Sequence, residues 1–312
     1  MNEATIQTLP TNNVSNNKKA LVSSKNLTNK AILLSVNVGG YTGVVKDKQL
    51  GAEMAALKNA KSDRINGSKN LIVSKELDAV RSAAGKIRII FYDNTAEWGT
   101  NNERICRSIN YIKVKQAIEE AIREYDEKVT AFLNVYDDLV EESKADLGDS
   151  FNASDFKSRA FLENRFKARV LVKPVPTSDF RSGVMDDDDI NYINKQIEDY
   201  TQEAVKNAQK DNLSRVQDKL NKLIERLMLT GSKGTRLHSS AVDNVVKAVE
   251  DARSLNISDD AEVDALLDDV ETNIKKIDVD LVKNHNVFRE ASIDTAKEAA
   301  SSITKTMESF DF

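Results

Sequence analysis

The fold is decided by residues 111–144, YIKVKQAIEEAIREYDEKVTAFLNVYDDLVEESK. Apolar side chains recur there at alternating intervals of four and three positions, which places them on one seam of a long helix. The seam consists of Ile118, Ile122, Tyr125, Val129, Phe132, Tyr136 and Leu139. Charged residues fill the other faces, so we expect the seam to be buried against another helix and to carry the helix interactions. Its two tyrosine hydroxyls require water or a polar partner at the seam's edge.

Composition favours long helices in the rest of the chain as well. Only three prolines and 11 glycines occur among 312 residues, so few positions interrupt a helix. Charged residues make up 30% of the chain, which suits helices with broad solvated faces. We therefore predict a mainly α protein, an elongated antiparallel helical bundle or coiled-coil arm with a small β-sheet at its base.

The chain divides into three predicted regions. Residues 1–30 hold few large apolar side chains and should form a disordered basic tail. Residues 31–180 should form a small α/β base with the long helical arm, at about 111–144, and residues 181–312 a helical region. Residues 1–74 hold ten Lys or Arg and four Asp or Glu, a balance of +6, whereas the whole chain carries −5. This basic arm leaves contact with nucleic acid open, although it contains a single aromatic residue.

Short β-branched stretches predict the strands of the small sheet. Ala31–Val38 ends at Gly39-Gly40, where a turn could return Tyr41–Val45 as a hairpin partner. Arg104–Ser108 is a second short strand. Phe166–Val172 alternates before a proline and should pair with one of the other two. Because the chain must return to the sheet after the long helix, we expect this helix to belong to an out-and-back arm and not to a continuous rod.

The same apolar periodicity predicts further helices. They are expected near Leu50–Ala60, over Ser74–Tyr92 with Ser74 as N-cap, near Ala153–Asn164, from Asp186 to Leu227, through Val242–Ala252 and Val263–Ile277, and over Ile293–Phe310. Ser258 or Asp259 should cap the helix that contains Val263. The Ile193–Leu227 periodicity slips in the polar stretch 206–212, which predicts a break or a change of supercoil. This helix and the Ile293–Phe310 helix are the candidates to cover the seam, with a coiled coil between chains as the alternative.

No group of residues predicts catalysis, a cofactor or a metal site. His238 and His285 lack a Cys or acidic partner at metal-ligand spacing, and Cys106 lacks the surroundings of a nucleophile. The acids at 186–189 are better explained by the helix start than by a calcium loop. Glycine-rich stretches at 39–43 and 231–235 have the wrong order for phosphate loops and predict turns. We expect no enzymatic activity.

The order of the expected elements is itself informative. Its markers are the strand Leu33–Val36, the helix Leu77–Phe91, the seam with Phe132 and Tyr136, the segment Phe166–Pro176, and Val242–Leu255 followed by Asn256-Ile257-Ser258-Asp259. Over about residues 31–277 this pattern resembles a family of phage and prophage proteins with long paired helices. Members are often encoded beside a CobS-like AAA+ ATPase, so the resemblance implies a partner or adaptor of such a machine. It supplies no site residues.

We therefore expect a non-enzymatic phage-type interaction, assembly or adaptor protein that acts through helical surfaces. Its expected partners are a second copy of the chain or an AAA+ ATPase. One alternative is a nucleic-acid accessory protein that uses the basic arm, with salt-sensitive binding. Another is a membrane-active bundle resembling pore-forming toxins, which the lack of an apolar run of about 20 residues disfavours. A single cysteine favours the cytoplasm, that of a bacterial host for a phage protein.

Overall fold

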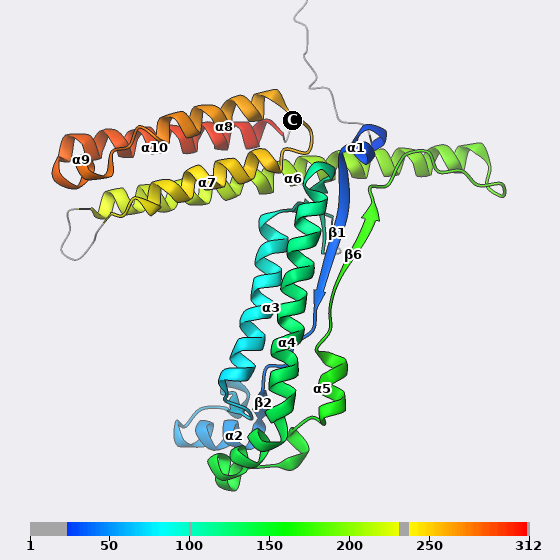
Figure 1. Cartoon of the computed structure of the whole chain (residues 1–312), viewed down its shortest axis with the longest axis vertical. Helices are drawn as coiled ribbons and strands as arrows, with labels where there is room; N and C mark the ends of the chain where they lie inside the picture. The colour runs from blue at the N-terminus through cyan, green and yellow to red at the C-terminus, as the bar shows by residue number, and fades with distance from the viewer. Residues whose placement is uncertain (1–23, 100–101, 231–236, 311–312) are drawn as a thin grey trace, which may run out of the picture.

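The computed structural model describes residues 24–99, 102–230 and 237–310. Within them the protein is mainly helical with a small antiparallel sheet, as predicted. Residues 1–23 of the predicted tail and the predicted turn at 231–235 lie outside the described residues. Figure 1 shows two helical units. The first, the sheet unit, stands upright around α3 (Lys75–Asp93) and α4 (Ser108–Leu147), and a bundle crosses above it.

The main sheet of the described residues is antiparallel throughout. Its strands lie in the order β4 (Ala96–Trp98), β5 (Glu103–Arg107), β1 (Ala31–Val38) and β6 (Ala168–Pro174). β1 pairs with β5 on one side and with β6 on the other, so the pairing predicted for residues 166–172 is confirmed. The hairpin predicted for Tyr41–Val45 is wrong. Because both edges of β1 are occupied, β2 (Val44–Asp47) pairs with β3 (Gly67–Asn70) instead.

The seam of α4 is buried within its own chain. Five of its members are buried and two are half-buried in one core, namely Ile118, Tyr125, Val129, Phe132 and Tyr136, then Ile122 and Leu139. α3 contributes Leu77, Val80, Ala84, Ile87 and Phe91 to that core. The prediction that the helices at 193–227 and 293–310 cover the seam is therefore wrong, because both pack in a different core. The short strands β4 and β5 bring the chain back directly after α3, so α3 and α4 pack together.

The seam's aromatic residues are fixed by rings and by backbone carbonyls. Phe132 makes an edge contact with Phe166, with ring centroids 5.8 Å apart. The Tyr125 hydroxyl donates to the Gly39 carbonyl at 3.0 Å, and the Tyr136 hydroxyl donates to the Lys157 carbonyl at 2.7 Å. The polar partners that the sequence requires for these hydroxyls are thus supplied by the protein itself.

Side-chain caps set several helix boundaries. Ser74 caps α3 as predicted, with its Oγ accepting from the Leu77 amide at 3.1 Å. α2 (Lys48–Leu57) matches the expected short helix. α5 (Arg159–Arg165) starts later than predicted, because Ser158 is its N-cap. The cap predicted at Ser258 or Asp259 is wrong by a residue or two, since Asp260 accepts from the first amides of the helix that follows.

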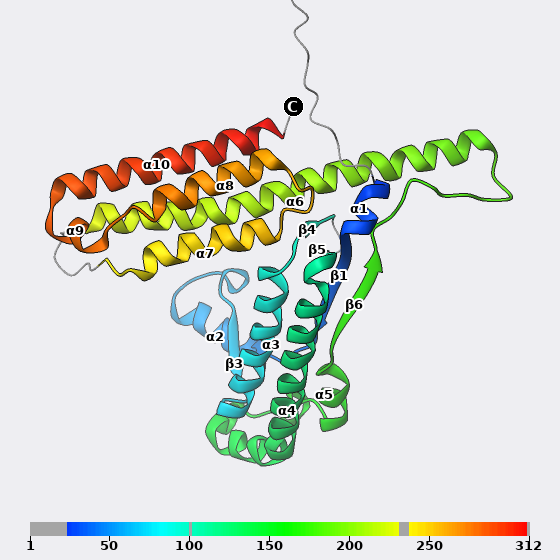
Figure 2. The ribbon, with the colours of Figure 1, turned by 45° about the horizontal axis from the view of Figure 1, so that its top comes forward.

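The helices of the bundle unit lie alongside one another in Figure 2, and they bury a core of their own. Its helices are α6 (Asp187–Leu229), α7 (Ser240–Ser254), α8 (Ala261–Ile274), α9 (Val279–Asn284) and α10 (Asn286–Ser309). Leu220, Val245, Leu267 and Ile303 are fully buried members of that core. The two helices that we expected to cover the seam, now α6 and α10, thus pack within one core. α6 continues through residues 206–212, where a break or change of supercoil was predicted.

The sheet lies between the α3–α4 helix pair and α6 of the bundle unit, with one face toward each. On one face Leu34 and Cys106 join the core of α3 and α4. On the other, Leu33 and Ile105 join a cluster that includes Ala204 and Ala208 of α6, with Ala31, Ala96, Trp98, Val175, Val205 and Ile257. This division follows from the alternation of side chains along β1 and β5. The sheet therefore connects two helical units, rather than closing the base of one arm.

The end of the predicted disordered tail is helical. Residues 24–30 form α1 (Ser24–Lys30), which leads directly into β1. Leu27 is completely buried in the cluster between the sheet and α6. Tertiary burial therefore orders a segment whose composition alone predicts disorder.

Candidate functional site

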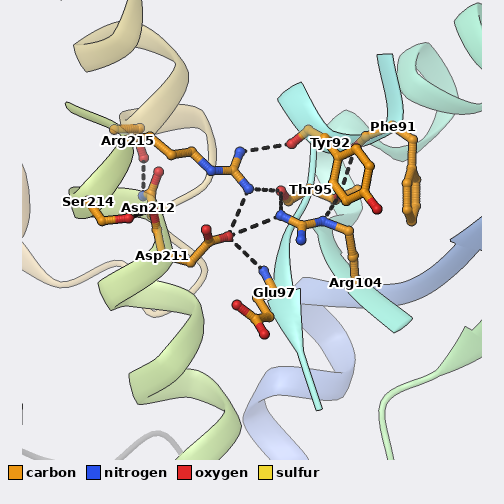
Figure 3. Close-up of polar contacts among 10 residues, drawn as sticks. Phe91, Tyr92, Thr95, Glu97, Arg104, Asp211, Asn212, Ser214 and Arg215 are labelled. Carbon is orange, nitrogen blue, oxygen red and sulfur yellow. Dashed lines mark hydrogen bonds and ion pairs between the residues drawn. The ribbon is translucent and has the colours of Figure 1, made fainter. Parts of the chain in front are cut away.

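The polar stretch of α6 is the joint between the two units (Figure 3). Asp211 Oδ2 accepts hydrogen bonds from the Glu97 amide at 3.0 Å, from Arg104 Nη2 at 3.0 Å and from Arg215 Nη2 at 2.8 Å. Glu97 lies on β4, Arg104 on β5 and Arg215 on α6 itself. One carboxylate oxygen thus ties α6 to two strands of the sheet.

The two arginines of this joint are held on several sides. Arg104 donates to the Thr95 hydroxyl at 2.9 Å and to the Thr95 carbonyl at 2.8 Å, and its guanidinium lies 4.8 Å from the centre of the Tyr92 ring. Arg215 donates to the carbonyls of Tyr92 and Thr95 at 2.8 and 2.9 Å. Burial lowers the pKa of Arg104, although the charge of Asp211 opposes that shift. The guanidinium remains charged at neutral pH.

This geometry suits a structural joint better than a reactive centre. The oxygen of Asp211 that faces the strands already accepts three hydrogen bonds from fixed protein donors. Gln209 and Asn212 are buried beside it, at 8% and 2% exposure. The buried positions of α6 continue at helical spacing through 206–212, but two of them are the polar residues Gln209 and Asn212, which interrupts the apolar periodicity. Local spacing could not reveal the partners, which lie more than 100 positions away in the chain.

A second polar tie joins the α7–α8 connection to the sheet unit. The Asp259 carboxylate accepts from Lys30 Nζ at 2.6 Å and from Arg107 Nη2 at 2.7 Å. Asn110 Nδ2 donates to the Ser254 carbonyl at 3.0 Å nearby. Together with the Asp211 cluster and the apolar residues between them, this tie fixes the bundle unit to the sheet unit.

The first half of α6 extends beyond the bundle. In Figures 1 and 2 it projects past α1 and β1, on the side away from α7, α8 and α10. We call residues 179–200, which include the connection before this helix, the α6 overhang. The connection is tied back where the Phe180 amide donates to Asn194 Oδ1 at 2.7 Å and Asn194 Nδ2 donates to the Phe180 carbonyl at 3.1 Å. This part of α6 is hydrogen-bonded to α1, where the Ser24 amide donates to the Glu198 carboxylate at 3.2 Å.

The overhang displays several exposed apolar side chains. Val184 is 97% exposed and Tyr192 is 63% exposed. Phe180, Met185 and Tyr200 are also exposed, and Ile190, Ile193 and Ile197 are half-buried. Within α6, the buried residues begin only at Thr201. The periodicity through Ile193 and Ile197 therefore continues the apolar stripe of a packed helix into a region where no helix of the bundle packs on it.

The overhang is also strongly acidic. Residues 179–200 contain seven acids and two bases, so their net charge is 2 − 7 = −5. The acids at 186–189 begin α6, with Asp186 as N-cap accepting from the Asp189 amide at 2.9 Å. This agrees with the helix-start explanation of that run. An apolar stripe bordered by acids is a surface that suits a protein segment with the opposite charge.

The other residues weighed from the sequence form no site in the described residues. Cys106 is completely buried, and burial raises the pKa of its thiol to about 11, so it is no thiolate nucleophile. His238 and His285 lie in different helical connections. The described part of the chain contains no group of three or more His, Cys, Asp or Glu placed to hold a metal ion. Nor does a helix in these ranges combine the length and apolar character needed to cross a membrane.

No protein-family model, curated protein or solved structure matches the chain.

Proposed function

We propose that this chain is a non-enzymatic interaction protein, an adaptor or assembly factor, and that the α6 overhang is its docking surface. The observation that carries the proposal is a pair of exposed apolar side chains, Tyr192 on the projecting helix and Val184 in the connection just before it, in a segment with a net charge of −5. An exposed apolar surface on a helix can recognise an amphipathic helix by its apolar face. The proposed partner segment is therefore basic and amphipathic.

Charge argues against a second copy of the chain at this surface. A symmetric pair would bring two overhangs together, each with a net charge of −5, and this repulsion opposes association. The joint built on Asp211 and the tie built on Asp259 support the same proposal, because they hold the projecting helix at a fixed angle to the rest of the molecule. An AAA+ ATPase remains the partner class proposed from the family resemblance alone.

The test is binding of a labelled basic amphipathic helical peptide to the full chain, followed by fluorescence anisotropy. A scrambled peptide with the same composition controls for charge without an apolar face. We expect saturable binding of the amphipathic peptide only, weakened at least about fivefold by Tyr192→Asp, since the loss of one central aromatic contact at a binding hot spot costs more than about 1 kcal/mol. Val287→Asp in α10, at a residue 76% exposed and outside the overhang, is the matched control and should bind like the native chain.

Two results would overturn the docking surface. Equal binding of the scrambled peptide would show that charge alone is recognised, and equal binding by Tyr192→Asp would place the contact elsewhere. Sedimentation velocity of the native chain and of Tyr192→Asp tests whether a second copy of the chain occupies this surface instead. A dimer that disappears in the variant would assign the overhang to a second copy and reject a basic partner.

A further inference from the structure

The two outer strands of the main sheet differ in what covers their free edges. Beside β4, the Glu97 amide donates to the Asp211 carboxylate of α6 at 3.0 Å. β6 is the other outer strand, and its strand partner is β1. In Figures 1 and 2, no helix or strand of the described ranges lies beside β6 on the side away from β1. β6 is distinct from the α6 overhang, so the argument for its edge does not depend on the proposed docking function.

The register of β6 determines which of its backbone groups point outward. In an antiparallel pair, residues bonded to the neighbouring strand alternate with residues whose N–H and C=O groups point away from it. The Gly39 amide donates to the Lys167 carbonyl at 2.9 Å, one position beyond the pair of Val38 and Ala168. Every second residue from Lys167 therefore bonds to β1, and the residues between them are directed outward. The outward amides belong to Ala168, Val170 and Val172, and no acceptor among the described residues bonds to them.

Positive charge is concentrated on this strand. Residues 165–174 contain four Lys or Arg and no Asp or Glu, a net charge of +4. Lys173 pairs with Glu103 of β5 at 2.5 Å, whereas no carboxylate of the described residues forms an ion pair with Arg169. Two β6 strands side by side would bring these cations together, and Lys and Arg on an edge strand oppose such pairing. The charge that disfavours a second copy at this edge favours an acidic segment.

The side chains of β6 alternate between its two faces. Arg169, Leu171 and Lys173 share one face, on which Leu171 is 44% exposed. Val170 and Val172 share the other face, where Val170 packs against the core of α3 and α4 and Val172 is 38% exposed. A strand added beside β6 therefore meets cations on one face and apolar side chains on the other.

We propose that the outer edge of β6 binds an extended acidic segment of a partner protein, which joins the sheet as a further strand. The outward amides and carbonyls of β6 supply the backbone hydrogen bonds, and side chains at alternate positions supply the specificity. Acidic side chains of the segment face Arg169 and Lys173, and apolar ones lie beside Val170 and Val172. The partner segment is thus an alternation of acidic and β-branched residues.

Fluorescence anisotropy with the full chain tests this edge. The probe is a labelled, end-capped peptide of alternating Glu and Val, about as long as β6, and the control peptide has Lys in place of Glu. We expect saturable binding of the acidic peptide and none of the basic one. Amide hydrogen exchange followed by NMR should show new protection at Val170 and Val172 in the complex. The amides of Leu171 and Lys173, which already bond to β1, should change little.

Two substitutions at one residue sharpen the test. Val172→Pro removes an outward N–H without removing a bond to β1, whereas Val172→Thr keeps that N–H and the β-branched shape. We expect Val172→Pro to bind the acidic peptide at least about fivefold more weakly, because a backbone hydrogen bond is lost. Val172→Thr should bind like the native chain. Arg169→Gln should weaken binding and reduce its salt dependence, whereas Lys305→Gln, at an exposed base on α10, should not.

N-methylation of the peptide tests backbone pairing without altering the chain. Methyl groups on the Val amides and methyl groups on the Glu amides block opposite edges of an extended peptide. One set should therefore abolish binding, and the other should be tolerated. Equal effects of the two sets would show that the peptide does not bind as a strand, whether or not Val172→Pro folds.

Other outcomes would also reject the proposed edge. They are the absence of saturable binding by the acidic peptide, equal binding of the Lys-containing peptide, and native-like binding by Val172→Pro with its fold verified by circular dichroism. A dimer in sedimentation velocity that disappears in Val172→Pro would assign the edge to a second copy instead. Tyr192→Asp should bind the acidic peptide normally, so that failure of the docking proposal and failure of this one remain distinguishable.

Discussion

Arg104 and Asp211 are separated by 107 positions in the chain, yet Arg104 Nη2 lies 3.0 Å from Asp211 Oδ2. Their side chains are only 10% and 22% exposed. The pair joins β5 of the sheet unit to α6 of the bundle unit, and Arg215 on α6 shares the same oxygen. A polar joint of this kind constrains the direction of α6 more strictly than apolar contacts do, because its hydrogen bonds depend on angle as well as on distance.

The first prediction concerns the strength of that joint. Asp211→Asn keeps the shape of the side chain but leaves two arginines without their anion, and breaking a largely buried pair is costly. Because the site is partly exposed, we expect a loss of about 2 kcal/mol in the free energy of unfolding. Urea unfolding at neutral pH measures it. Glu225→Gln, at an exposed acid of the same helix, should change the value by less than about 0.5 kcal/mol. Equal effects of the two substitutions would contradict a structural joint.

The second prediction concerns the seam of α4. Phe132 is completely buried and contacts the rings of Tyr136 and Phe166. Phe132→Ala should destabilise the protein by about 3–5 kcal/mol, because it removes buried surface and leaves a cavity. Ile109→Ala, at a position 82% exposed near the start of the same helix, should change stability by less than about 0.5 kcal/mol. Guanidinium unfolding compares them, and similar midpoints would show that the seam is not a core.

The third prediction compares substitutions at the two adjacent glycines after β1, Gly39 and Gly40. A Cβ on Gly39 would lie 1.9 Å from the Arg165 carbonyl oxygen, whereas a Cβ on Gly40 meets nothing within 4 Å. The backbone of Gly39 is held on both sides, by the Lys167 carbonyl and the Tyr125 hydroxyl. Gly39→Ala should therefore cost about 1–3 kcal/mol through overpacking, and Gly40→Ala less than about 0.5 kcal/mol. Thermal unfolding of both variants is the measurement, and the reverse order would refute the close approach at Gly39.

Local periodicity predicts the elements of this fold better than their partners. The spacing of apolar residues identifies α4, and the Ser74 cap fixes the start of α3. β-branched stretches identify β1, β5 and β6, and their pairing follows because few strands are available. The partner of the seam cannot be found in this way, since every amphipathic helix offers a similar stripe. The short strands β4 and β5 decide it, by returning the chain beside α3.

The candidate site is likewise only partly visible in the sequence. Ile193 and Ile197 are visible in the sequence as an apolar stripe, but only the fold shows that this stripe projects beyond its bundle. The Asp211 joint appears in the sequence merely as a polar interruption at 206–212. α1 is missed because a helix of seven residues is marginal by itself and depends on the burial of Leu27. Long-range contacts, which single-chain patterns do not encode, determine all three features.

The last prediction concerns pH and the tie at Asp259. The hydrogen bond from Lys30 lowers the pKa of Asp259 below its ordinary value of 3.8, burial opposes this shift, and the charge of Arg107 adds to it. A carboxyl whose pKa is lower in the folded state contributes stability above its unfolded pKa. That contribution is lost as the pH falls through the folded pKa. Asp259→Asn should therefore be less stable than the native chain near neutral pH, and the difference should shrink as the solution becomes acidic.

Asparagine is a suitable replacement because Asp259 has a φ of 52°, a left-handed conformation that Asn tolerates. Urea unfolding of both chains from about pH 6 to about pH 3 measures the difference in unfolding free energy, in the range where a carboxyl of this kind titrates. A chain that already carries Lys30→Met and Arg107→Gln is the control, in which Asp259→Asn should have little effect at any pH. A difference that stays constant or grows on acidification would show that these two cations do not stabilise the carboxylate. The polar tie would then position the α7–α8 connection against the sheet unit without adding pH-dependent stability.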